Sequence, residues 1–239
     1  RQGKLGIGFT DANVKVGNTA LDSLTTGNYN TAVGNAALTA NTTGNNNTSV
    51  GNESLDANTT GASNTAIGAA ALGVNSTGDN NVAVGALALD ANTTASANTA
   101  VGRASLSANT TGATNTAVGY NALVTNTTAS NNTAVGAEAL TTNTTGTKNT
   151  AVGAYALEDN TTADNNTALG YRAARNLTTG SENTAIGQAA LDTSTTAASC
   201  VAVGYQAMYY NTDGGENTAV GTNALLNNTT AHNLSLIHI

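Results

Sequence analysis

The chain has 239 residues, of which only 9% are charged and 3% aromatic, and it contains no proline and no tryptophan. Its formal net charge of -7 is the opposite of the clustered cations that nucleic acids require, so we expect no nucleic-acid partner. The longest apolar run, Ala66 to Val74, is far shorter than the roughly 20 residues that span a bilayer. We therefore expect no membrane insertion by this segment.

Residues 1–12 precede the regular part of the chain. They begin on Arg1, without an initiator Met or the charged and apolar regions of a signal peptide, which predicts that the sequence is an excerpt from a longer protein. We expect residues 1–12 to form a partial cap. The alternative is that GIG, Gly6 to Gly8, is a decayed copy of the repeat that follows.

Residues 13–233 consist of thirteen consecutive 17-residue repeats without insertion or deletion, such as NTAVGNAALTANTTGNN from Asn30 to Asn46. An unbroken period near 20 residues is typical of a solenoid. Val and Thr in short alternation, bounded by Gly and Asn, indicate strands and turns. The sequence predicts an all-β protein, a parallel β-solenoid (β-roll) of thirteen 17-residue rungs, and its constant register argues against an Asn-rich disordered tract.

Columns of the repeat, numbered 1 to 17 from Asn13, predict which side chains point inward. Position 5 is Gly in every copy, which indicates a tight corner with positive φ or close backbone approach. Position 3 is usually Ala but is Lys15 in the first copy, so we expect it to face outward and positions 2 and 4 to face inward. Position 9, nearly always Leu, predicts a second inward column on a second short strand at positions 8–10.

The second corner carries Asn-Thr-Thr-Gly. Its position 12 is Asn in ten copies and Leu24, Leu177 or Ser194 in the others, which predicts a partly inward Asn that stacks in a hydrogen-bonded ladder. The sequons that result, such as Asn41-Thr42-Thr43, could accept glycans in a secretory host, although turn chemistry explains the same residues.

Positions 3 and 8 stay small in every copy but the first, whereas positions 6, 7 and 10 vary freely. If both small columns face outward, close packing against another chain is the simplest reason for their size. We therefore expect self-association, with the Ala columns that contain Ala32 and Ala37 near the contacts.

The last six residues, 234–239 with the sequence LSLIHI, leave the repeat pattern. They resemble the in-frame translation of a sequencing-library adaptor, so we expect a non-native tail that adds nothing to the repeat core. The alternative is a genuine short apolar strand after the repeats.

The combination of NTAVG, AL and NTTG at 17-residue spacing resembles the repeats of bacteriophage tail-fibre-like and bacterial surface proteins. Many of these end in an autoprocessed intramolecular chaperone of the endosialidase type. The repeat is also distantly similar to that of trimeric autotransporter adhesin heads. The resemblance implies a homotrimeric structural stalk or adhesin segment that presents a terminal binding module, located outside the cell, on a cell surface or on a virion.

Residues able to carry catalysis or hold a cofactor are scarce. The two histidines, His232 and His238, and the single cysteine, Cys200, allow no catalytic triad, intrachain disulfide or Cys-based zinc site. The position-10 aspartates, such as Asp56 and Asp90, never occupy adjacent rungs, so a calcium ladder is not expected. We expect a protein that is not an enzyme and has no cofactor.

An alternative function is the binding of ice or another crystal surface. Thr42, Thr59, Thr93 and their equivalents would form a file at the strand spacing of about 4.8 Å. Adjacent Thr residues point to opposite sides, however, and leave one file instead of the paired files that a flat array needs.

One cluster of variable residues is a candidate contact for a host-surface glycan, a protein or a neighbouring fibre. Six of the seven tyrosines lie beyond residue 119, two of them at position 6 in rungs two apart. Tyr and Arg are enriched at binding hot spots. The candidate residues are Tyr171, Arg172, Arg175, Tyr205, Tyr209 and Tyr210. The alternative is an exposed face without a partner.

Overall fold

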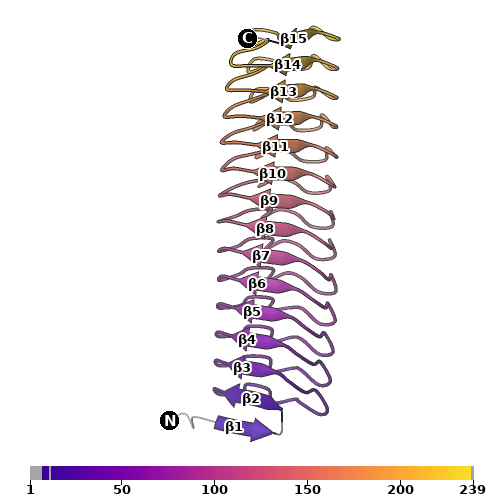
Figure 1. Ribbon diagram of the computed structural model, residues 1–239. Helices are drawn as coiled ribbons and strands as arrows, with labels where there is room; N and C mark the ends of the chain where they lie inside the picture. Colours follow the sequence, from indigo (N-terminus) through magenta and orange to yellow (C-terminus); the bar gives the residue numbers. More distant parts are fainter. Residues whose placement is uncertain (1–6, 11, 238–239) are drawn as a thin grey trace. The chain divides into compact units, whose positions relative to one another are not determined.

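The computed structural model describes residues 7–10 and 12–237, with side chains from residue 12 onward. The described residues form strands and turns and contain no helix (Figure 1), which confirms the all-β prediction. The chain divides into two compact units, Arg1–Asn115 and Thr116–Ile239, and each is described by itself. His238 and Gly6, on which two of the predictions fall, lie outside the described residues.

Each unit is a stack of short strands. In the first unit these are β1 (Ile7–Thr10), β2 (Asn13–Val16), β3 (Thr31–Val33), β4 (Thr48–Val50), β5 (Thr65–Ile67), β6 (Val82–Val84) and β7 (Thr99–Val101). In the second they are β8 (Thr116–Val118), β9 (Thr133–Val135), β10 (Thr150–Val152), β11 (Thr167–Leu169), β12 (Thr184–Ile186), β13 (Val201–Val203), β14 (Thr218–Val220) and β15 (Ser235–Ile237).

Successive rungs stack in parallel with equivalent positions paired. In the first unit Thr31 pairs with Thr48 and Val33 with Val50, and in the second Thr150 pairs with Thr167. Backbone hydrogen bonds between rungs continue outside the strands, as from Leu38 N–H to the Ser54 carbonyl at 3.0 Å. Both units are therefore parallel β-solenoids with 17 residues per turn, as predicted.

Each rung has one strand, so the predicted second strand at positions 8–10 is wrong. These positions form turns, and positions 7 and 9 are left-handed, with φ of 53° at Ala36 and 55° at Leu38. The left-handed residues interrupt the alternation of an extended strand, so Ala37 and Leu38 both point inward and are fully buried. Hydrogen bonds from Ala36 and Leu38 to neighbouring rungs, at 2.9 and 3.0 Å, help to offset the cost of this conformation.

The predicted orientation of the strand is also wrong. Ala32 at position 3 is 0% exposed, whereas Thr31 and Val33 on either side are only partly buried. Positions 3 and 8 meet across the interior, because the hydroxyls of Ser49 and Ser54 lie 2.5 Å apart in the one rung that has Ser at both. The small columns thus pack against each other within one chain, and Leu at position 9 completes the core.

Lys15 misled the prediction because it belongs to the first rung. Its side chain is 32% exposed and its ammonium lies 2.6 Å from the Asp22 carboxylate. At the end of the coil an inward position remains open to water. A lysine in the first rung therefore does not indicate that position 3 faces outward in the later rungs.

Two asparagine columns hold the corner of each rung. The predicted position-12 ladder is confirmed and fully buried: Asn58 Nδ2 donates to Asn41 Oδ1 at 2.9 Å and to the Gly61 carbonyl at 3.0 Å. A second buried column, at position 1, was not predicted. There the backbone N–H of Asn47 donates to Asn30 Oδ1 at 3.0 Å, and the Asn47 amide donates to the Gly61 carbonyl at 2.9 Å.

The glycine corner combines both predicted features. Gly34 has φ of 144°, and a Cβ placed on it would lie 2.2 Å from the Gly51 carbonyl oxygen in the next rung. A side chain at position 5 would therefore separate the rungs.

The two ends of the repeat pair with their neighbours in different directions. β1 pairs antiparallel with β2, which suits a cap, whereas a decayed copy of the repeat would pair in parallel like the other rungs. β15 pairs in parallel register with β14, and Leu234 N–H donates to Asn217 Oδ1 at 2.8 Å. Ser235–Ile237 therefore continue the ladder through backbone pairing while their side chains stay exposed, and the expectation that residues 234–239 add nothing to the repeat core stays a prediction. Their adaptor origin stays a prediction.

Candidate binding surface

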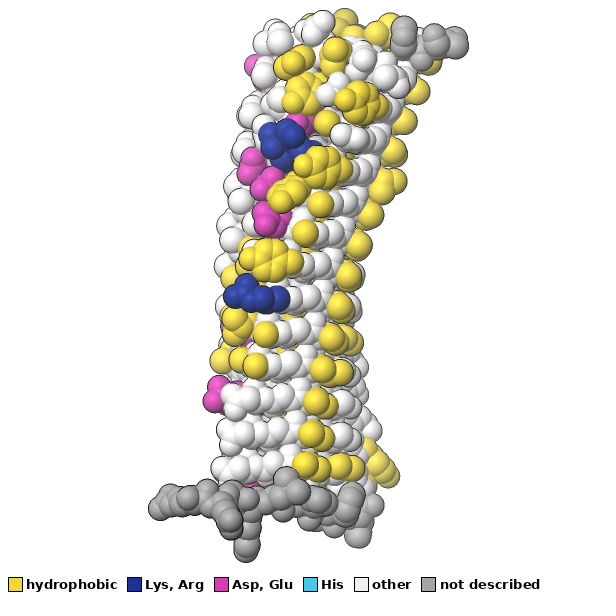
Figure 2. Space-filling model, turned by 90° about the vertical axis from the view of Figure 1, so that its left-hand side faces the viewer, with side chains coloured by type: hydrophobic (Ala, Val, Ile, Leu, Met, Phe, Trp, Pro, Cys, Tyr) yellow, Lys and Arg dark blue, Asp and Glu magenta, His cyan; other side chains and the backbone are white. Residues whose placement is uncertain are grey.

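The predicted partner-contact residues lie on the turn segments of the second unit, at positions 6, 7, 10 and 11 of neighbouring rungs. Figure 2 shows dark blue Arg side chains gathered with apolar and acidic side chains on one face. We call this surface the Arg–Tyr face and define it by Tyr155, Tyr171, Arg172, Arg175, Asp192, Tyr205, Tyr209 and Tyr210.

A buried carboxylate fixes the two arginines. Arg172 Nη2 donates to Asp192 Oδ2 at 2.8 Å, and Arg175 Nε lies 3.2 Å from Asp192 Oδ1. Asp192 is fully buried, while both arginines keep about a third of their side chains exposed. The Nε–H of Arg175 donates to Asn176 Oδ1 at 3.0 Å, so its contact with Asp192 Oδ1 is an ion pair without a hydrogen bond. The sequence analysis missed Asp192 in this role, although it occupies position 10 one rung after Arg175.

Electrostatics keep Arg172 charged. Partial burial by itself would lower the pKa of Arg172, but the charge of the Asp192 carboxylate and its hydrogen bond raise that pKa above its ordinary value. The guanidinium is thus a permanent, oriented cation beside the tyrosine rings.

The tyrosines form two ring pairs. Tyr155 and Tyr171 meet edge to face with centroids 5.9 Å apart and planes at 85°, and Tyr209 and Tyr210 do so at 4.7 Å and 81°. Tyr205 shares position 6 with Tyr171 two rungs away, which places their Cα atoms about 10 Å apart. Tyr171, Tyr205 and Tyr210 are each about half exposed. The structure thus joins Tyr171 to Tyr155, a residue that the sequence analysis missed.

Carboxylates border the arginines. Burial raises the pKa of Glu158, the charges of Asp159 and Glu138 raise it further, and Arg175 and Arg172 partly offset the rise. Two cations therefore face four carboxylates, a local balance of -2, from Arg172 and Arg175 against Glu138, Glu158, Asp159 and Asp192.

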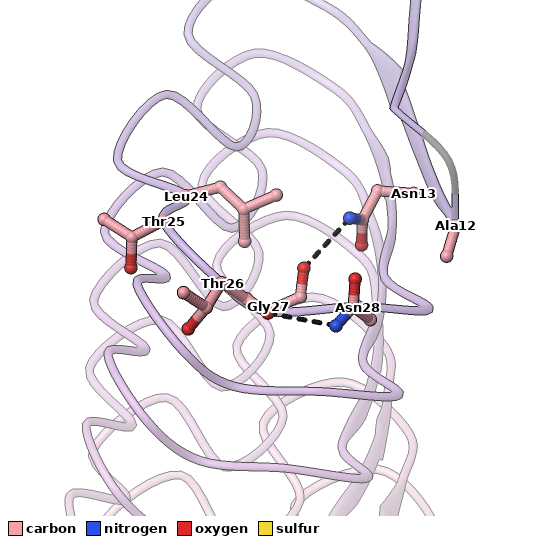
Figure 3. Close-up of a pocket in the computed structure, with 7 residues that line it drawn as sticks. All are labelled: Ala12, Asn13, Leu24, Thr25, Thr26, Gly27 and Asn28. Carbon is pink, nitrogen blue, oxygen red and sulfur yellow. Dashed lines mark hydrogen bonds between the residues drawn. The ribbon is translucent and has the colours of Figure 1, made fainter.

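A cavity of about 230 Å³ lies at the first rung of the first unit (Figure 3) and is lined by Ala12, Asn13 and residues 24–28. Two lining amides are engaged within the rung, as Asn13 Nδ2 donates to the Gly27 carbonyl at 2.9 Å and Asn28 Nδ2 to the Thr26 carbonyl at 3.0 Å. No acid or base side chain lines this cavity, so it offers no proton-transfer chemistry.

Cys200 replaces one Asn of the position-1 column. It is buried, its thiol donates to the Gly214 carbonyl at 3.3 Å, and burial raises the pKa of that thiol. A raised thiol pKa suits packing, because the thiolate is the reactive form. In the described part of the chain, no three His, Cys, Asp or Glu side chains group as they would around a metal ion. That part also contains no helix with the length and hydropathy needed to cross a membrane.

A second surface, which we call the strand face, consists of positions 2 and 4 of every rung. Thr and Val dominate it, and its most exposed large members are Ile67 in the first unit and Leu169 in the second, at 41% and 47%. No described residue hydrogen-bonds the hydroxyls of Thr31, Thr48 or Thr65. Most rungs therefore present a Thr hydroxyl and an aliphatic side chain on the same side, while Val14, Val82 and Val201 replace the Thr in three rungs.

The chain matches no protein-family model, no curated protein and no solved structure. Its class is defined by the fold alone. It is a β-solenoid repeat protein, with two surfaces that differ in chemistry.

Proposed function

We propose that the chain is a non-enzymatic structural stalk segment of a fibrous surface or tail-fibre-like protein, outside the cell or on a virion. In this proposal it forms a homotrimer and carries a terminal binding module. The observation that supports self-association is the strand face, which leaves an aliphatic side chain at least partly exposed in every rung. A repeated apolar column of this kind is typical of an interaction surface.

The contacts proposed here differ from those expected from the sequence. Ala32 and Ala37 are buried inside their own chain and cannot reach another copy. The strand face replaces them. Another copy of this chain is the occupant that fits best, because its rungs have the same 17-residue period and can match the face rung by rung.

Sedimentation velocity of the chain at micromolar concentration tests the proposal. The paired substitution Ile67→Lys and Ile186→Lys places two charges on the strand face, and we expect it to convert the trimer to monomers, because buried unpaired charges are costly. The matched control is Leu87→Lys with Val74→Lys, two equally exposed aliphatic residues on turn segments. A wild-type chain that sediments as a monomer would overturn the proposal.

Ice or crystal binding is the second candidate function. The strand face suits it better than the Thr file that contains Thr42, on which the sequence analysis based this alternative. Hydroxyls of that earlier file are engaged, since Thr42 Oγ1 donates to the Thr59 carbonyl at 3.1 Å. The strand face instead offers paired files, Thr at position 2 and Val at position 4, repeating at about 4.8 Å. Thermal hysteresis by a monomeric wild-type chain, lost in Ile67→Lys with Ile186→Lys, would favour this candidate.

A further inference from the structure

The Arg–Tyr face has the chemistry of a ligand-binding surface that is separate from the strand face. We propose that it binds a neutral oligosaccharide, with sugar rings stacked on Tyr171 and Tyr205 and hydroxyls bonded to Arg175 and its neighbours. The proposal does not depend on self-association.

Preorganised aromatic rings are the first step of the argument. Tyr171 is about half exposed, yet its ring is held edge to face by Tyr155 at 5.9 Å. Tyr210 is likewise held by Tyr209 at 4.7 Å. A ring that is already ordered loses little conformational entropy on binding and presents a flat apolar face.

Spacing along the coil is the second step. Tyr171 and Tyr205 share position 6 and lie two rungs apart, about 10 Å between Cα atoms. One sugar ring cannot cover two rings at that separation, whereas a chain of sugars running along the coil can. Gln188, the exposed position-6 residue of the rung between them, supplies an amide that can bond hydroxyls.

Oriented donors are the third step. Asp192 and Asn176 engage Arg175 through Nε, and the terminal nitrogens Nη1 and Nη2 have no hydrogen-bond partner among the described residues. A guanidinium held in this way presents planar donors at fixed positions, which suits the hydroxyls of a sugar.

Charge then selects the class of oligosaccharide. The balance of -2 around the two arginines repels phosphates, sulfates and uronic or sialic acids. Asp192 already forms ion pairs with both of the cations that an acidic sugar would need. A neutral sugar pays no such penalty, and the surrounding carboxylates can accept hydrogen bonds from its hydroxyls.

The experiment uses the full chain and follows tyrosine fluorescence while neutral hexasaccharides of glucose, mannose, galactose and N-acetylglucosamine are added. A hexasaccharide of galacturonic acid is the acidic comparison. We expect at least one neutral probe to bind with an affinity that hardly changes with salt. Tyr171→Ala with Tyr205→Ala should weaken that binding at least about tenfold.

Control variants separate ligand stacking from loss of fold. Tyr29→Ala removes an exposed tyrosine of the first unit, 69% exposed, and should leave binding unchanged. Tyr171→Phe with Tyr205→Phe keeps the rings and should retain most of the binding. The monomeric strand-face variant should bind as well as the wild type, so failure of the stalk proposal and failure of this one are distinguishable. Binding of the acidic probe alone, binding of no probe, or equal loss in the Tyr29→Ala variant would overturn the proposal.

Discussion

At the scale of single residues, buried amides set the corner of each rung. Asn143 Nδ2 donates to Asn126 Oδ1 and to the Gly146 carbonyl, both at 3.0 Å, while its own Oδ1 accepts from Asn160 at 2.8 Å. The ladder stops at the next rung, where Leu177 offers no donor and Asn160 Oδ1 is left buried without a partner. A ladder position therefore tolerates Leu at the cost of an unsatisfied acceptor.

This cost is measurable at Asn143. Asn143→Leu should destabilise the second unit, because it removes the hydrogen bonds that Asn143 donates to Asn126 Oδ1 and to the Gly146 carbonyl and the one that it accepts from Asn160, at about 1 kcal/mol each. Urea unfolding followed by circular dichroism measures the loss. Thr145→Ala, at a neighbouring exposed position, should change stability very little. Equal stability of the two variants would mean that the ladder contributes nothing.

At the scale of the rung, the repeat predicts period and corners better than side-chain direction. The invariant Gly and the 17-residue spacing are readable because glycine has a distinct backbone preference and parallel stacking preserves register. Left-handed turns at Ala36 and Leu38 are not readable, because neither residue type favours that conformation. Assuming strand alternation there turned position 8 outward, and Lys15 did the same for position 3, so both small columns were taken for an outer surface.

A pair of substitutions tests the corrected orientation. Ala37→Glu places a carboxylate in the interior and should destabilise the first unit by at least about 3 kcal/mol, whatever the oligomeric state. Ala36→Glu is the matched control, since position 7 carries glutamate naturally at Glu53 and Glu138. Thermal unfolding should show a large loss for the first variant and little for the second. If Ala37→Glu left stability unchanged, position 8 would have to face outward, as the sequence analysis expected.

In the candidate site, too, the repeat period determines which residues share a column, whereas side-chain packing determines which residues touch. A 17-residue period is enough to place Tyr171 and Tyr205 in one column, and the structure agrees. The contacts of Asp192 with two arginines depend on side-chain reach across rungs, and the ring contact of Tyr155 depends on a left-handed residue at position 7. Neither follows from composition or spacing.

At the scale of the whole molecule, the account assigns different partners to two surfaces. The strand face, repeated in every rung, is proposed to meet other copies of the chain. The Arg–Tyr face is confined to a few rungs of the second unit and is proposed to meet a sugar. A uniform surface suits assembly and a local cluster suits recognition, so the two roles need not compete.

Distances between spin labels on different copies test the central claim most directly. With Cys200 replaced by Ala, one label is placed at Ile186→Cys on the strand face and, in a separate chain, at Leu87→Cys on a turn segment. Pulsed electron resonance should give a short distance between copies for the strand-face label and a much longer one for the turn label. A longer distance at residue 186 than at residue 87, or no intermolecular distance at either, would contradict assembly through the strand face.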